Sequence, residues 1–148
     1  MSATSRPVHT VVVDWDGTAV PHKWPDRPTE FMPGFVENMR RIHEAGMRIV
    51  IFSARLNPHD PYTGQRSARW ETEAAANFQY IRSTLDAAGL SFIAIWAKEG
   101  KPSGAVYVDD KAERYNGCAK CWDKVTDRIL VRLGKEEAVF PAFEMEGR

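Results

Sequence analysis

Two aspartates stand two residues apart, directly after an apolar run. The run Val8–Val13 leads into Asp14-Trp-Asp16, and Gly17 and Thr18 follow as a turn glycine and a hydroxyl group. Two carboxylates that share a space repel each other unless a cation or a proton lies between them. Mg²⁺ prefers carboxylate oxygens together with waters and a substrate phosphate. The pattern therefore indicates chemistry on a phosphate group, and the alternative is an exposed acidic turn.

Further polar residues follow other apolar runs of the chain. Ser53 ends the run Ile49–Phe52, and Asp109 and Asp110 end the run Val106–Val108. Continuous apolar runs are typical of strands that are buried on both faces of a parallel sheet. The ligand crevice of such a sheet lies beyond the carboxyl ends of its strands. These polar groups are therefore expected to gather at one edge of the sheet.

Strands and helices alternate along the chain, which predicts an α/β fold with a parallel sheet and helices on both faces. The expected strands are 8–13, 47–52, 91–96 and 105–108, and the expected helices are 35–45, 70–88 and about 119–133. Prolines within 19–32 exclude a long helix there and indicate a flap or hairpin. The polar segment 56–69 is expected to be a loop of functional length. The whole chain, 1–148, is expected to form one domain.

The motifs together resemble those of the haloacid dehalogenase (HAD) superfamily of phosphatases. In chain order they are Asp14-x-Asp16-Gly-Thr18, Ile49–Ser53, Lys101-Pro102 and Val106–Asp110. They follow the order of the family's four motifs and lie within residues 8–117. The resemblance implies a Rossmann-like HAD fold and a Mg²⁺-dependent phosphatase.

The resemblance also implies catalytic roles. Asp14 would attack phosphorus and become phosphorylated. Asp16 would protonate the leaving oxygen and later take a proton from the attacking water. Lys101 would neutralise charge on the phosphoryl group, and Lys98, three residues earlier, competes for this role.

The implied Mg²⁺ ligands come from the first and fourth motifs. They are Asp14, the backbone carbonyl of Asp16, Asp109 as a direct ligand and Asp110 through a water. The assignments of Asp109 and Asp110 can be exchanged. Two thiols elsewhere, Cys118 and Cys121, have the spacing of half a zinc site, but a closed site usually needs four ligands.

Contacts with the phosphate are expected from Thr18, from the Ser53 hydroxyl and from the backbone N–H of Ala54. Taken alone, Ser53 fits an N-cap or turn serine better. Arg55 could contact the substrate or pair with an acid. Trp15 could touch the leaving group or pack beneath the sheet edge.

The spacing of the motifs leaves no room for a separate cap domain. The intervals from Asp14 to Ser53 and from Ser53 to Lys101 are already filled by the expected elements. By resemblance this implies a capless or minimally capped member. Its open site could accept a bulky or polymeric substrate, or could be closed by another subunit of a homo-oligomer.

The leading interpretation is a phosphomonoesterase acting on a small phosphorylated molecule, and two alternatives stay open. A polynucleotide 3′-phosphatase, acting on nucleic-acid ends, is favoured by the missing cap, by Ser53-x-Arg55 and by Asp109-Asp110. A net charge of +0 and the absence of a kinase P-loop oppose it. A catalytically silent HAD-fold binding domain is the alternative from another class, although both aspartates of the first motif are kept. A phosphomutase-like transferase fits the motifs as well.

The composition suggests a cytoplasmic protein. Lys plus Arg and Asp plus Glu number 20 each, so no global field attracts nucleic acid or a membrane surface. No apolar run approaches the roughly 20 residues that span a bilayer. The first residues lack the apolar stretch of a secretory signal, so we expect no membrane partner.

Overall fold

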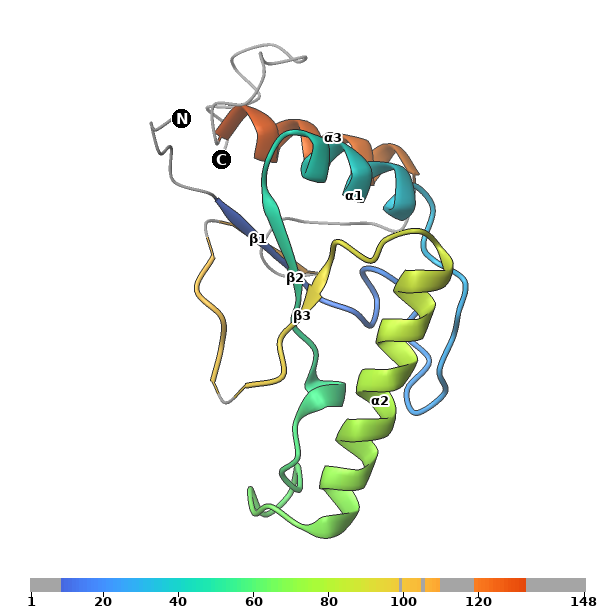
Figure 1. Cartoon of the computed structure of the whole chain (residues 1–148), viewed down its shortest axis with the longest axis vertical. Coiled ribbons are helices and arrows are strands. Elements are labelled where there is room, and N and C mark those ends of the chain that lie inside the picture. The colour runs from blue at the N-terminus through green and yellow to red at the C-terminus, as the bar shows by residue number, and fades with distance from the viewer. Residues whose placement is uncertain (1–8, 99, 105, 110–118, 133–148) are drawn as a thin grey trace.

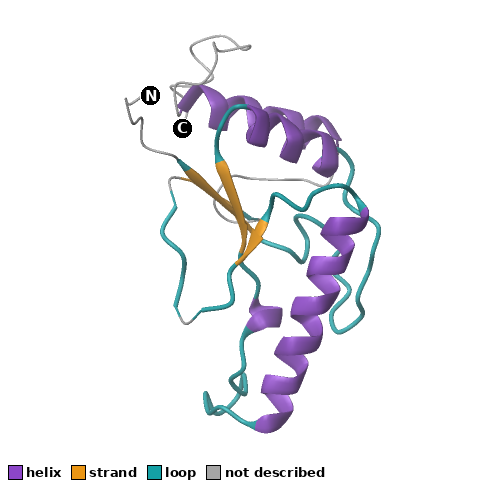
Figure 2. Ribbon diagram, in the orientation of Figure 1, coloured by secondary structure: helices purple, strands orange, loops and turns teal. Residues whose placement is uncertain are grey.

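The computed structural model describes residues 9–98, 100–104, 106–109 and 119–132. Strands and helices alternate in this part of the chain (Figures 1 and 2). The elements are β1 (Thr10–Val13), α1 (Phe35–Glu44), β2 (Arg48–Ile51), the 3₁₀ turn η1 (Ala54–Leu56), α2 (Ala68–Ala87), β3 (Ala94–Ile95), β4 (Val106–Val108) and α3 (Ala119–Arg132). The strands form a parallel sheet in the order β3-β2-β1-β4, which confirms the predicted α/β class.

β1 lies inside the sheet and is paired on both sides. Val11 is in register with Ile49 of β2 and with Val106 of β4. All three side chains are buried, with at most 3% of their surface exposed. A strand in this position buries both faces, which explains why its sequence is continuously apolar instead of alternating.

The start of α2 is fixed by a local cap. Ser67 has an extended backbone, and its side chain accepts the N–H of Trp70 at 3.3 Å. A serine in this position satisfies one of the free N–H groups of the first helical turn. α2 therefore begins at Ala68, two residues before the start predicted from the apolar pattern.

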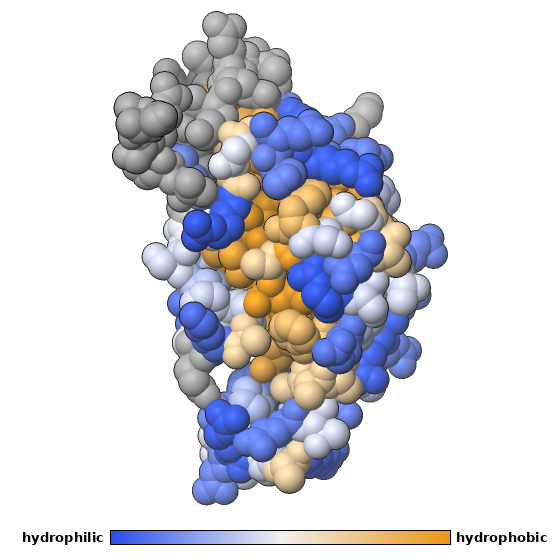
Figure 3. Space-filling model, in the orientation of Figure 1, coloured by the Kyte–Doolittle hydropathy of each residue, from blue (hydrophilic) through white to orange (hydrophobic). Residues whose placement is uncertain are grey.

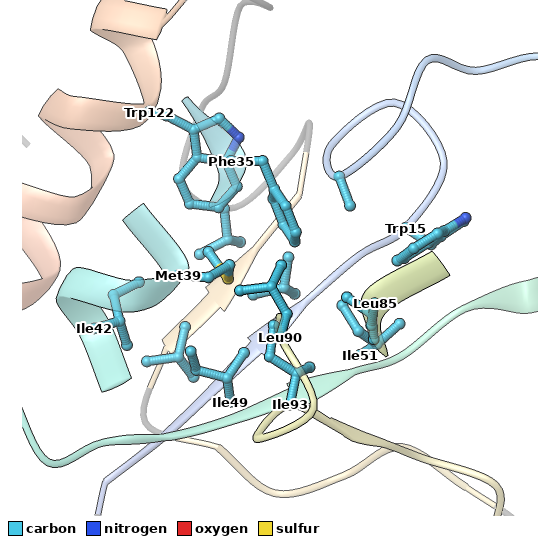
Figure 4. Packing of buried hydrophobic residues seen from close by; sticks show 14 of the residues in the cluster. Trp15, Phe35, Met39, Ile42, Ile49, Ile51, Leu85, Leu90, Ile93 and Trp122 are labelled. Carbon is cyan, nitrogen blue, oxygen red and sulfur yellow. The ribbon is translucent and has the colours of Figure 1, made fainter. Parts of the chain in front are cut away.

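Helices α1, α2 and α3 contribute to one apolar core on a single face of the sheet. Val11 and Val13 belong to this core, whereas Val12, whose side chain points to the opposite face, does not. The helical members of the core are Phe35, Met39 and Ile42 of α1, Tyr80, Ile81 and Leu85 of α2, and Trp122, Val125, Ile129 and Leu130 of α3. Figure 4 shows this packing, in which Phe35 and Trp122 meet edge to face at 5.7 Å between ring centroids.

The prediction of helices on both faces is wrong for the described part of the chain. The steps from β1 to β2 and from β2 to β3 run in the same direction across the sheet. Right-handed crossovers therefore place α1 and α2 on the same face. The return from β3 to β4 could carry a helix on the opposite face, but its described residues form none. A loop approaches that face instead, and a Cβ on Gly104 would lie only 2.6 Å from Cγ2 of Val12.

Residues 19–32, predicted as a flap or hairpin, contain no strand, so they are not a hairpin, and residues 21–34 are called the flap. β3 is shorter than the predicted 91–96, because residues 91 and 92 lie in a turn. Among the described helices, none is long and apolar enough to cross a membrane.

Candidate functional site

A small pocket lies at the carboxyl ends of β1 and β4. Its volume is about 260 Å³, and its lining includes Asp14, Ala54, Lys101 and Asp109. The backbone N–H of Asp14 donates to the carbonyl of Val108 at 3.0 Å, so the pairing of β1 with β4 extends to the first aspartate. Asp14, Ala54 and Asp109 meet because parallel strands end at one edge of the sheet, and Lys101 reaches the pocket from the segment between β3 and β4.

The turn after β1 is fixed by a buried tryptophan. Gly17 has a φ of +82°, a left-handed conformation that glycine adopts without strain. The N–H groups of Thr18 and Ala19 both donate to the carbonyl of Trp15, at 3.2 and 2.9 Å. Trp15 is fully buried, and its indole N–H donates to the Tyr80 hydroxyl at 3.1 Å. Trp15 is therefore a packing residue, which was one of its two predicted roles.

The carboxylate of Asp16 is held by Arg55. Nε of Arg55 lies 3.1 and 3.0 Å from the two carboxylate oxygens, and Nη2 lies 2.9 Å from Oδ1. The Arg55 side chain is 0% exposed and that of Asp16 is 15% exposed. Arg55 thus pairs with an acid, as one of its two predicted alternatives states. In this arrangement Arg55 lines neither the small pocket nor a larger cleft beside it.

The flap and α2 hold Arg55 in place. Its Nη2 donates to the carbonyl of Asp26, and its Nη1 donates to Oδ1 of Asn77 at 3.4 Å. Asn77 in turn donates to the Arg55 carbonyl at 3.1 Å. The guanidinium carbon lies 4.8 Å from the ring centroid of Trp24 and 5.3 Å from that of Tyr80. Sequence reasoning missed Asn77 and Tyr80, because nothing in the pattern of α2 marks them as partners of an arginine.

Tyr80 ties the flap to α2. Its hydroxyl donates to the carbonyl of Pro28 and accepts the indole N–H of Trp15. Burial raises the pKa of the Tyr80 phenol above its ordinary value, while the Trp15 hydrogen bond and the charge of Arg55 act in the opposite direction. The phenol therefore stays protonated at neutral pH and keeps its hydrogen bond to the flap.

Ser53 and Ala54 follow β2, as the second motif predicts. Ser53 is 6% exposed, and its hydroxyl oxygen accepts the N–H of Arg55 at 3.1 Å. This is the N-cap role that its sequence also fits, and the hydroxyl still has a proton to donate. Ala54 is exposed and borders the small pocket, whereas Ser53 lines a larger neighbouring cleft.

Thr18 lies away from both cavities. It is fully buried, and within the described residues its hydroxyl has no hydrogen-bond partner. Its carbonyl accepts the indole N–H of Trp122 at 3.3 Å, which places Thr18 against α3. This position gives no support to the predicted phosphate contact.

The two candidate lysines lie at different cavities. Lys101 lines the small pocket together with Asp14 and Asp109. Its Nζ lies 4.4 Å from the ring centroid of Tyr107. Lys98 lines the larger cleft, where its Nζ lies 5.8 Å from the ring centroid of Trp96. This placement favours Lys101 as the lysine that faces a phosphoryl group.

The small pocket offers part of the predicted magnesium site. Mg²⁺ is often bound by one or two carboxylates, with waters and substrate phosphate as the other ligands. Asp14 and Asp109 supply two carboxylates at one pocket, so they fit this pattern. Across the described ranges, no group of three or more His, Cys, Asp or Glu side chains could hold a metal. The predicted ligand from Asp16 is its backbone carbonyl, but Asp16 does not line the pocket, and its carboxylate is paired with Arg55.

Two predicted features lie outside the described residues. One is Asp110, the expected water-mediated ligand. The other is the thiol pair, because Cys118 and the side chain of Cys121 are not described.

A larger cleft of about 1150 Å³ adjoins the small pocket, and Phe52 and Ala54 line both cavities. Its other walls come from α2, from the segment after η1 and from the residues that follow β3. Sequence reasoning marked loop 56–69 as functional, but it missed the aromatic walls formed by Phe78 and Trp96. The position of Trp96 at the end of a predicted strand was the available signal.

No protein-family model matches the chain, and neither a curated protein nor a solved structure matches it. The resemblance to HAD phosphatases therefore rests on the motifs themselves. Each of the four motifs contributes to the lining of the small pocket, through Asp14, Phe52, Lys101 and Asp109 in chain order.

Proposed function

We propose that the protein is a Mg²⁺-dependent phosphomonoester hydrolase that acts through an aspartyl-phosphate on Asp14. The observation that carries the proposal is that Asp14, Lys101 and Asp109 line one pocket of about 260 Å³. A carboxylate nucleophile beside a lysine and a second carboxylate suits an anionic phosphoryl group that arrives with a cation. The pocket is smaller than the roughly 300–1,000 Å³ of most ligand sites, so it suits the phosphate better than a whole substrate.

The reaction has two steps at phosphorus. A carboxylate oxygen of Asp14 forms a bond to phosphorus while the bond to the leaving oxygen breaks, and that oxygen takes a proton from Asp16. Water then attacks the phosphorus of the aspartyl-phosphate and gives a proton to Asp16. The bond to Asp14 breaks and inorganic phosphate leaves. Lys101 balances phosphoryl charge throughout, and Mg²⁺ held by Asp14 and Asp109 would supply further charge neutralisation.

The ion pair with Arg55 sets a condition on the acid–base step. Both oxygens of Asp16 accept N–H groups of Arg55. For Asp16 to donate a proton, one oxygen has to leave the guanidinium. Because Arg55 is also bonded to Asp26 and Asn77, the carboxylate is the partner that moves.

The same ion pair favours a second candidate function. A domain that keeps Asp16 engaged by Arg55 could bind a phosphorylated ligand at Asp14, Lys101 and Asp109 without transferring the phosphoryl group. This catalytically silent binding domain predicts ligand binding with no turnover. The two candidates differ in one measurable property, which is hydrolysis.

The test is hydrolysis of p-nitrophenyl phosphate by the purified full chain, with Mg²⁺ and with EDTA. The proposal expects turnover that requires Mg²⁺ and that is lost in Asp14→Asn. Asp60→Asn is the matched control, because Asp60 lines neither cavity and its oxygen accepts N–H groups of its own loop. Retained turnover in Asp14→Asn would overturn the proposal. Binding of inorganic phosphate without any hydrolysis would favour the silent domain.

A further inference from the structure

The large cleft is placed to receive the part of a substrate that lies beyond its phosphate. We propose that it binds the nucleoside of a nucleotide whose phosphate occupies the small pocket, and this rests on the proposed function. Phe52 and Ala54 line both cavities, so one ligand can extend from the first into the second. The chemistry that is recognised is a phosphate ester of a nucleoside, either as a free mononucleotide or as the terminal nucleotide of an oligonucleotide.

The size of the cleft argues against a small leaving group. Its volume of about 1150 Å³ exceeds that of the neighbouring pocket, about 260 Å³, several times over. Sites for drug-sized ligands commonly span roughly 300–1,000 Å³. A phosphorylated three-carbon alcohol or amino acid would leave most of the cleft to water. A nucleoside fills much more of it.

Aromatic side chains from three elements line the cleft. They are Phe52 after β2, Phe78 of α2 and Trp96 after β3. All three are half-buried, so each keeps some exposed surface. In Figure 3, apolar side chains gather beside α2 on the visible face, between hydrophilic groups. Aromatic faces bind nucleic-acid bases by stacking, whichever base is present.

The ring of Trp96 is held in a fixed orientation. Its indole N–H donates to the carbonyl of Gly100 at 2.9 Å, which satisfies the polar group of the ring. Nζ of Lys98 lies 5.8 Å from the ring centroid and adds a positive charge at the same wall. A flat ring with a nearby cation suits a ligand that is both aromatic and anionic.

Polar groups accompany the aromatic walls. Asn57 Oδ1 accepts the backbone N–H of His59 at 3.0 Å and lies 2.8 Å from Nδ1 of the same histidine, and both residues line the cleft. The carboxylate of Glu71 is paired with Arg66 at 2.9 Å, so its charge is balanced. Amide and imidazole groups can hydrogen-bond base edges or ribose hydroxyls. An acyl chain of a lipid phosphate could make no hydrogen bond with them.

The experiment compares substrates and variants of the full chain. Turnover is measured on adenosine 5′-monophosphate, adenosine 3′-monophosphate, a 3′-phosphorylated oligonucleotide and glycerol phosphate. Trp96→Ala and Phe78→Ala remove one aromatic wall each, and Tyr62→Ala is the control, because Tyr62 is 94% exposed and outside the cleft. We expect KM for the preferred nucleotide to rise about 10-fold in each wall variant, with glycerol phosphate turnover unchanged.

The outcomes separate this proposal from the proposed function. Equal kcat/KM on glycerol phosphate and every nucleotide would overturn the cleft assignment while hydrolysis stands. If no phosphate ester is hydrolysed, equilibrium dialysis with adenosine monophosphate decides. Binding that weakens about 10-fold in Trp96→Ala and not in Tyr62→Ala would support the cleft without the chemistry, and no binding would overturn it. The mononucleotide and oligonucleotide arms identify the source of the nucleotide.

Discussion

Asp14 and Asp16 are two residues apart and lie in contrasting surroundings. Asp14 lines a pocket beside Lys101 and a second carboxylate, where a ligand can reach it. Asp16 is paired with Arg55, whose side chain is completely buried beneath the flap. β1 ends at Val13 and the chain bends at Trp15, so the two acids do not continue one strand and their carboxylates lie in different places. One short motif thus supplies one acid for a ligand and another that is tied to the protein's own structure.

The largest expected effect separates the two acids by activity and stability. Asp14→Asn should lower turnover of p-nitrophenyl phosphate by about 10³-fold or more, as expected when a nucleophile is removed. Its urea-unfolding midpoint should stay near that of the wild type. Asp16→Asn should lower both the turnover and the urea-unfolding midpoint, because Arg55 then loses its charged partner. Equal destabilisation by the two substitutions would contradict the contrast.

Arg55→Ala should reduce the free energy of unfolding by about 3–5 kcal/mol, because Asp16 is left partly buried without its partner. Arg66→Ala is the matched control. Its pair with Glu71 has side chains 53% and 48% exposed, and exposed pairs contribute about 0–1 kcal/mol. Urea unfolding of both variants measures the difference. If both variants lose similarly small amounts of unfolding free energy, the Asp16–Arg55 pair contributes no more than an exposed ion pair.

Lys101→Ala should lower kcat for glycerol phosphate by about 10²-fold, because a group that stabilises the phosphoryl charge is lost. Lys98→Ala should leave this rate almost unchanged, since Lys98 lies at the cleft and not at the small pocket. Steady-state kinetics on the two variants test the assignment. A larger loss of kcat in Lys98→Ala than in Lys101→Ala would assign the neutralisation of phosphoryl charge to Lys98.

The smallest expected effect concerns Tyr80 at high pH. Burial raises the pKa of this phenol above 10.0, so between that pH and the raised pKa the folded state binds more protons than the unfolded chain. The free energy of unfolding should therefore decrease as the pH rises above about 10. Tyr80→Phe should lack this contribution, although it loses about 1–3 kcal/mol at neutral pH because Trp15 keeps an unsatisfied N–H.

The measurement for Tyr80 is urea unfolding at about pH 8 and about pH 11, on either side of the ordinary tyrosine pKa. The difference between wild type and Tyr80→Phe should shrink at the higher pH. Tyr62→Phe is the control, since this ring is 94% exposed and should follow the wild type at both values. A constant difference for Tyr80→Phe would contradict the role of burial.

Much of the fold could be predicted because its signals are local. β1 and β2 each have a neighbouring strand on both sides, and strands in this position are buried and therefore appear in the sequence as short apolar runs. α1 is recognisable because its buried residues Phe35, Met39 and Ile42 recur at helical spacing. The layer of helices could not be predicted in this way. It depends on the strand order and on the loop between β3 and β4, which are properties of the whole topology.

The candidate site divides in the same manner. Asp14, Lys101 and Asp109 follow strand ends, or precede a strand, in a recognisable order, and they line one pocket. The partner of Arg55 could not be chosen from sequence, because several acids were available and the choice depends on the closure of the flap and α2. The position of Thr18 also depends on a distant part of the chain. Its carbonyl meets Trp122, which is more than a hundred positions away in the chain.

The most direct test of the central claim is binding of beryllofluoride, which mimics a phosphoryl group on a carboxylate. Fluorine NMR would be recorded on the full chain with Mg²⁺, with EDTA, and on Asp14→Asn. We predict a bound fluorine signal that requires Mg²⁺ and is absent in Asp14→Asn. A bound signal that persists in Asp14→Asn would contradict the assignment of Asp14 as the residue that accepts the phosphoryl group.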